Sequence, residues 1–181
     1  MLLSEDRFQR PLWSCLVVAL SLAVLGADAS AQTNGQIHRG AVEDARNGRF
    51  DDALPSLRAL VLREPNVLRW RYDLVAVLSW ANRHVEARDA ARNLRLGNNT
   101  PSYVLAAIGK SALEAGDAAR SLQSWSRLLQ RQPKNADTLL GVALAQLAGA
   151  DPKPAGATLQ RLMATVGNNR PQRQAIAEAL R

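Results

Sequence analysis

The fold is decided by the segment NGRFDDALPSLRAL, residues 47–60, because its pattern recurs along the chain at a constant interval. The turn position of this pattern is occupied by Gly48, Asn82, Gly116 and Ala150. Asn82 replaces the glycine of the first copy, and asparagine is the next best residue for the left-handed turn expected there. A small residue follows each turn position five residues later, at Ala53, Ala87, Ser121 and Ala155. A leucine follows seven positions after that, at Leu60, Leu94, Leu128 and Leu162. These three sets of residues recur at the same interval without an insertion, which indicates an internal repeat.

The interval between these columns matches the period of the tetratricopeptide repeat, a helix–turn–helix unit of about 34 residues that stacks on copies of itself. The sequence therefore predicts an all-α fold, a right-handed superhelical α-solenoid of about four tetratricopeptide repeats plus a C-terminal single helix. The expected repeats span residues 34–67, 68–101, 102–135 and 136–169. Residues 170–181 form either a capping helix or the first helix of a truncated fifth repeat.

Turn and breaker residues place the helices within these repeats. In the first repeat, helices are expected over Ile37–Asn47 and Asp51–Arg63. The second helix of the second repeat is expected over Val85–Leu96, ending at a Gly-Asn-Asn break. In the third repeat, Gly109 is expected to let its helix approach a partner closely. In the fourth, residues 151–154 (DPKP) are expected to replace the turn and delay the second helix. Gly156 is expected to weaken the first turn of that helix, which makes this repeat the least stable.

Residues 1–31 differ from the repeats and resemble a secretory signal peptide. Arg7 and Arg10 precede an apolar run over residues 12–25, which is short for a membrane span. Small residues follow, and cleavage is expected after Ala31. An uncleaved membrane anchor is the alternative. The signal predicts a periplasmic protein, free or associated with the outer membrane, with no integral membrane segment after cleavage.

Composition narrows the function further. The single cysteine, Cys15, lies inside the apolar run, so the mature chain has no thiol for a disulfide, a metal site or catalysis. Cleavage removes two of the 23 basic residues and three of the 16 acidic ones, which raises the formal charge from +7 to +8. Such a charge can attract polyanions, but no nucleic-acid motif accompanies it, and nucleic acid is not an expected partner.

Motifs for catalysis or cofactor binding are not found. The two histidines, His38 and His84, stand in different repeats without nearby ligands for a metal, and His84 is expected to pack in the core. The chain has neither a G-x-S-x-G elbow nor a G-x-x-x-x-G-K phosphate loop. We therefore expect a protein that is not an enzyme and needs neither cofactor nor metal.

Repeat solenoids bind partners through a concave face, which in this architecture is lined by the first helix of each repeat. The candidate binding residues on that face are Arg46, Arg69, Tyr72, Trp80, Tyr103 and Lys110. Aromatic rings can stack on sugars or anchor a peptide, and basic groups donate to acids or hydroxyls. The alternative is that Tyr72 and Trp80 pack between helices. Lysine and asparagine, which grip acidic peptide tails in some such proteins, are missing at residues 38, 42, 73, 103 and 107.

Three stretches carry a resemblance to a known family: residues 48–54 (GRFDDAL), residues 73–83 (DLVAVLSWANR) and residues 101–109 (PSYVLAAIG). They resemble the periplasmic repeat region of the poly-β-1,6-N-acetylglucosamine export porins, the PgaA family. The resemblance covers nearly all of the mature chain but only the front part of such an exporter.

The resemblance implies a periplasmic scaffold that guides a biofilm exopolysaccharide or docks its deacetylase partner. Partly deacetylated polymer is cationic, so a domain with a large positive charge gains no long-range attraction to it, and docking a protein is at least as plausible. The alternative function is a generic periplasmic tetratricopeptide adaptor that joins proteins of the cell envelope.

Overall fold

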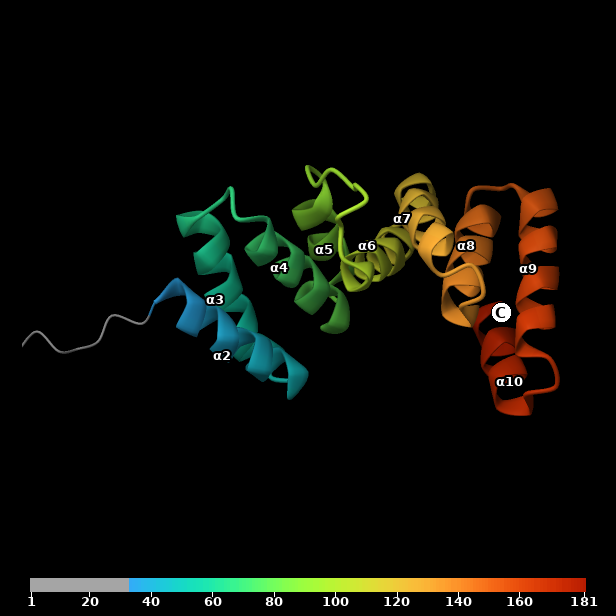
Figure 1. The fold of residues 1–181 in the computed structure, drawn as a ribbon, viewed down its shortest axis with the longest axis horizontal. Helices are drawn as coiled ribbons and strands as arrows, with labels where there is room; N and C mark the ends of the chain where they lie inside the picture. The colour runs from blue at the N-terminus through green and yellow to red at the C-terminus, as the bar shows by residue number, and fades with distance from the viewer. Residues whose placement is uncertain (1–32) are drawn as a thin grey trace, which may run out of the picture.

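The computed structural model describes residues 33–181, and every regular element in that range is an α-helix (Figure 1). The helices are α2 (Asn34–Arg46), α3 (Phe50–Arg63), α4 (Leu68–Trp80), α5 (His84–Ala91), α6 (Ser102–Glu114), α7 (Ala118–Arg131), α8 (Ala136–Ala148), α9 (Pro152–Val166) and α10 (Arg170–Ala179). The expected all-α class is confirmed for these residues. The predicted signal peptide lies outside the described range.

Four tight turns, at the constant interval seen in the sequence, separate α2 from α3, α4 from α5, α6 from α7 and α8 from α9. Gly48 and Gly116 have φ angles of 76° and 77° there, and Asn82 and Ala150 have angles of 55° and 57°. The left-handed turn expected at Asn82 is therefore confirmed. Alanine is disfavoured in this conformation, so the packing of the flanking helices must impose it at Ala150.

Each helix packs against the next along the chain, and α4 also contacts its alternate neighbours α2 and α6, as α6 contacts α8. The pairs follow one another along the longest axis, from α2 and α3 at one end to α9 and α10 at the other (Figure 1). The small residue of each repeat is fully buried, at Ala53, Ala87, Ser121 and Ala155. Side chains this small let two helices approach closely.

The close approach expected at Gly109 is made by an aromatic ring. The indole of Trp125 in α7 lies between Gly109 of α6 and Gly141 of α8. A Cβ atom at Gly109 would stand 2.6 Å from Cε2 of that ring, and one at Gly141 would stand closer still. Trp125 thus joins three consecutive helices, α6, α7 and α8.

The prediction of a helix over Val85–Leu96 is wrong, because α5 ends at Ala91. Leu94 and Leu96 are buried while Asn93 and Arg95 are exposed, an alternation of period two that suits an extended segment. The carbonyl groups of this segment are satisfied by arginines of α7. Arg120 donates to the carbonyls of Ala91 and Leu94, and Arg131 donates to those of Gly97, Asn98 and Thr100.

The delayed helix expected after the fourth turn is also wrong. Ala150 takes the turn position, Asp151 is the N-cap residue, and α9 begins at Pro152. Proline fits here because amide groups in the first helical turn have no intrahelical acceptor. The last helix, α10, packs against α9 and buries Ile176. None of the helices over residues 33–181 is long and apolar enough to cross a membrane.

Candidate functional site

Helices α2, α4 and α6 together line a pocket of about 310 Å³. Its lining residues are His38, Val42, Arg46, Arg69, Asp73, Trp80 and Tyr103. A second pocket of about 470 Å³ shares four of these residues, His38, Val42, Arg46 and Arg69, and adds Arg39 and Glu43. We call the joined surface the Trp80 groove.

Helical spacing explains why these side chains share one surface. Residues 38, 42 and 46 are four positions apart and therefore lie on one face of α2. Residues 69, 73 and 80 similarly follow one face of α4, from its first turn to its last residue. Tyr103 extends the surface from the first turn of α6.

Asp73 connects the three helices through hydrogen bonds. Its Oδ2 atom lies 2.6 Å from Nε2 of His38, and its Oδ1 atom accepts a 2.6 Å bond from the hydroxyl of Tyr103. Both carboxylate oxygens are therefore engaged by neighbouring helices. His38 is only 3% exposed and lies at the base of the groove. The trio of His38, Asp73 and Tyr103 therefore links the three helices beneath the exposed surface.

Trp70 supports the groove from below. Its indole Nε1 donates a 2.7 Å hydrogen bond to Glu64, which fixes the ring. The His38 ring lies against it with the centroids 4.5 Å apart. The guanidinium of Arg69 stands 5.8 Å from the centroid of the same indole, a distance at which a cation is attracted to the ring face.

The exposed aromatic surface of the groove is provided by Trp80 and Tyr103, which are 47% and 43% exposed. Burial, followed by the hydrogen bond and charge of Asp73, raises the pKa of Tyr103 well above its ordinary value of 10.0. Arg69 opposes this shift. The phenol therefore stays a neutral donor across the physiological range, with its ring held in one orientation.

Four of the six candidate binding residues come together in the groove: Arg46, Arg69, Trp80 and Tyr103. Tyr72 is half-buried against the core cluster around Val75 and Leu105, and does not line the groove. For Tyr72 the packing alternative is therefore the better description, whereas Trp80 is exposed. Lys110 is exposed on α6 but lies outside the lining of both pockets.

Asp73 was missed as the centre of the groove. Its distances along the chain from His38 and from Tyr103 both differ from the repeat interval, so none of the three shares a repeat column. The sequence did contain a chemical indication of this contact, because an acid, a histidine and a tyrosine lie on the first helices of three consecutive repeats. His84, expected to pack, is half-buried with Nδ1 3.3 Å from the hydroxyl of Ser111.

Within residues 33–181, no cluster of three or more histidine, cysteine or acidic side chains is placed to hold a metal ion. What the groove can do chemically follows from its groups. It offers two aromatic faces, the guanidinium groups of Arg46 and Arg69, and a preoriented phenol. These groups suit the recognition of a ligand with a flat apolar face and adjacent acceptor atoms.

Neither the models of known protein families nor the curated proteins include a match to this chain.

Proposed function

We propose that residues 33–181 form a tetratricopeptide-repeat solenoid, a right-handed superhelix, that acts as a non-enzymatic periplasmic binding module. Its ligand, an exopolysaccharide of the poly-N-acetylglucosamine type or a partner protein such as a deacetylase, binds in the Trp80 groove. The left-handed turns at a constant interval support the architecture. The resemblance of residues 73–83 and 101–109 to the export porins supports the ligand class.

The observation that carries this proposal is the exposure of Trp80 and Tyr103 beside Arg46 and Arg69 in one groove. Exposed apolar surface that is rimmed by polar groups marks interaction sites, and aromatic and arginine side chains are enriched among the residues that dominate the binding energy of interfaces. The hydrogen bond to Asp73 holds Tyr103 in place before the ligand arrives. Such preorganisation lowers the entropy lost on binding.

Catalysis is the weaker interpretation of the trio of His38, Asp73 and Tyr103. His38 is only 3% exposed, so its ring offers almost no surface to a substrate, and its Nε2 atom is bonded to Asp73. Asp73 itself has both oxygens engaged. Geometry of this kind rigidifies a surface.

A second candidate function is that of an adaptor for an acidic peptide, and the charge of the groove favours it. Arg39, Arg46 and Arg69 line it, whereas the acids of the groove are Glu43 and the fully bonded Asp73. A cationic, deacetylated sugar is repelled by this arrangement, while a peptide carrying glutamate is attracted. Both candidates use the same aromatic faces.

The test is a calorimetric titration of the purified protein and its Trp80→Ala variant. The ligands are an N-acetylglucosamine oligomer, a partly deacetylated oligomer and a peptide of alternating glutamate and leucine. Trp80→Ala should weaken binding of the preferred ligand at least about tenfold, since truncating a central aromatic anchor costs about 2 kcal/mol or more. Leu62→Ala, at a strongly exposed residue of α3 outside the groove, is the matched control and should leave the affinity unchanged.

Tighter binding of the acetylated oligomer than of the peptide would support the polysaccharide, and the reverse would support the adaptor. The melting temperature of each variant separates binding from folding. If Trp80→Ala lowers it as much as the loss of a core residue does, Trp80 is structural and the groove proposal fails. Binding of none of the three ligands would also contradict it.

A further inference from the structure

A cluster of arginines surrounds another pocket, of about 490 Å³, which lies outside the Trp80 groove and shares no residue with it. It lies between α5, the α6–α7 turn and the first turn of α7. Its lining residues are Arg88, Arg92, Ala115, Gly116, Asp117 and Arg120. We call it the arginine pocket.

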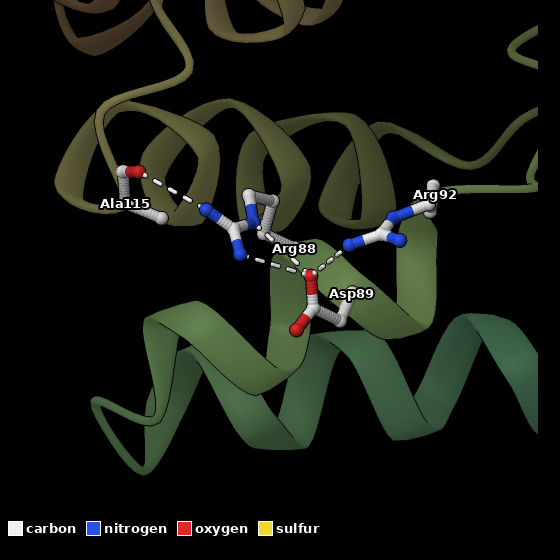
Figure 2. Close-up of polar contacts among 4 residues, drawn as sticks. All are labelled: Arg88, Asp89, Arg92 and Ala115. Carbon is white, nitrogen blue, oxygen red and sulfur yellow. Dashed lines mark hydrogen bonds and ion pairs between the residues drawn. The ribbon is translucent and has the colours of Figure 1, made fainter.

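The arginines are oriented by hydrogen bonds, which engage all three nitrogens of Arg88 but only one of Arg92. Arg88 and Arg92 both donate to a single oxygen, Oδ1 of Asp89, at 3.0 Å and 2.8 Å (Figure 2). Arg88 also reaches the carbonyl of Ala115 at 3.3 Å. A guanidinium carries five N–H groups, and only one nitrogen of Arg92 has a partner within residues 33–181. Its side chain is 70% exposed.

Arg120, in the first turn of α7, is held by the end of α5. Its Nη2 donates to the carbonyls of Ala91 and Leu94 at 3.2 Å and 2.6 Å, and its Nη1 donates to Oε1 of Gln123 at 2.8 Å. Burial lowers the pKa of its guanidinium, and the charge of Arg127 adds to this while Asp117 opposes it. An arginine nonetheless stays charged at neutral pH, so the pocket has a fixed positive rim.

Positive charge continues beyond this pocket. A neighbouring pocket of about 570 Å³ shares Arg92 and Arg120 and adds Arg95 to the lining. The acids close to the arginines are Asp89 and Asp117, so basic groups outnumber acidic ones across the two pockets. Arg92 follows the last residue of α5, and the carboxylate of Asp89 already lies between it and Arg88, so two guanidinium groups share one negative charge.

We propose that Arg88, Arg92 and Arg120 form an anion site that binds a phosphate group. The lining contains no aromatic residue, so charge and hydrogen bonding select the ligand. Guanidinium groups match phosphate oxygens in bidentate geometry, and a phosphate monoester offers three acceptor oxygens and close to two negative charges. A soluble phosphate ester and a phospholipid headgroup both present anionic phosphate oxygens, although the diester of a phospholipid has two free oxygens and one negative charge.

The test measures binding to the purified protein by calorimetry for inorganic pyrophosphate and succinate, and by flotation for vesicles. Phosphatidylglycerol vesicles are compared with phosphatidylcholine vesicles. Arg92→Gln removes an exposed guanidinium of the pocket, and Arg173→Gln removes an exposed one from α10 as the matched control. Loss of charged hydrogen bonds should weaken binding about tenfold or more for Arg92→Gln and less than about twofold for Arg173→Gln. Trp80→Ala should have no effect, which separates this site from the groove.

Binding of pyrophosphate identifies a soluble phosphate source, and binding of phosphatidylglycerol vesicles alone identifies a lipid headgroup. Three results would overturn the proposal. The first is that neither phosphate probe binds at millimolar concentration. The second is that succinate binds as tightly as pyrophosphate. The third is that Arg173→Gln weakens binding as much as Arg92→Gln. The last result would mean that net charge, and not the pocket, attracts the anion.

Discussion

The Gly109→Ala substitution adds one methyl group to α6 where the indole of Trp125 already lies. The new Cβ atom would stand 2.6 Å from both Cε2 and Nε1 of the ring, closer than real side chains approach. The ring cannot retreat, because Gly141 of α8 lies against it on the other side. The strain must therefore move helix α6 or force Trp125 out of its rotamer.

The expected cost is the difference between two effects. Overpacking a filled core costs about 1–3 kcal/mol, and a ring enclosed on both faces places this site at the upper end. Alanine is favoured over glycine inside a helix by about 1 kcal/mol, which partly offsets the strain. We expect a net loss of about 2 kcal/mol in the free energy of unfolding, or about 4–8 °C in melting temperature for a chain of this size.

The assay is urea unfolding followed by far-ultraviolet circular dichroism. Gly156→Ala in α9 is the matched control, because a Cβ atom there meets no other atom within 4 Å. It should stabilise the protein by about 0.5–1 kcal/mol. In a Trp125→Ala background, Gly109→Ala should lose its cost and become stabilising by a similar amount.

Two outcomes would refute this reasoning. Gly109→Ala could be as stable as the parent, which would mean that the indole does not fill the space between α6 and α8. Alternatively, its cost could persist in the Trp125→Ala background, which would place the strain elsewhere.

Three further predictions concern single side chains. Tyr103→Phe should lose less stability than the parent protein between about pH 9 and about pH 12. A tyrosine with a raised pKa stabilises the fold fully below its unfolded pKa near 10, and this contribution is lost as the pH rises through its folded pKa. An equal loss of stability in the variant and the parent would contradict this. Arg131→Gln should speed amide exchange in residues 92–100, whereas Arg161→Gln, which loses one weak 3.4 Å bond, should not; unchanged exchange in Arg131→Gln would show that its bonds do not hold the segment. Leu128→Ala should destabilise the protein by about 2–5 kcal/mol in the same urea assay, and a cost below about 1 kcal/mol would show that this leucine is not core.

The sequence was most informative where one residue type decides a local conformation. Glycine and asparagine at the turn positions predict the left-handed backbone, and the same interval places Ala150 at the fourth turn, where it adopts that conformation. The buried small residues followed from the same register. Each of these features depends on a residue and its neighbours in the chain.

Features that depend on distant partners were not predictable in the same way. Propensity and spacing favoured a helix through Leu96, but arginines of another helix supply the hydrogen bonds that stabilise an extended segment. The bonds of Asp73 to His38 and Tyr103 also cross repeats outside the repeat register. The grouping of Arg46, Arg69, Trp80 and Tyr103 could be predicted, because helical faces alone place them, but the side chain that fixes the groove could not.

The central claim, that a ligand binds in the Trp80 groove, is tested most directly by NMR shift mapping of the isotope-labelled protein. The N-acetylglucosamine oligomer and the acidic peptide are added in separate titrations. We predict that the largest shifts occur at the indole N–H of Trp80 and at backbone amides of α2, α4 and α6, with α9 and α10 unchanged. Shifts confined to α9 and α10, or no shift with either ligand, would contradict the account.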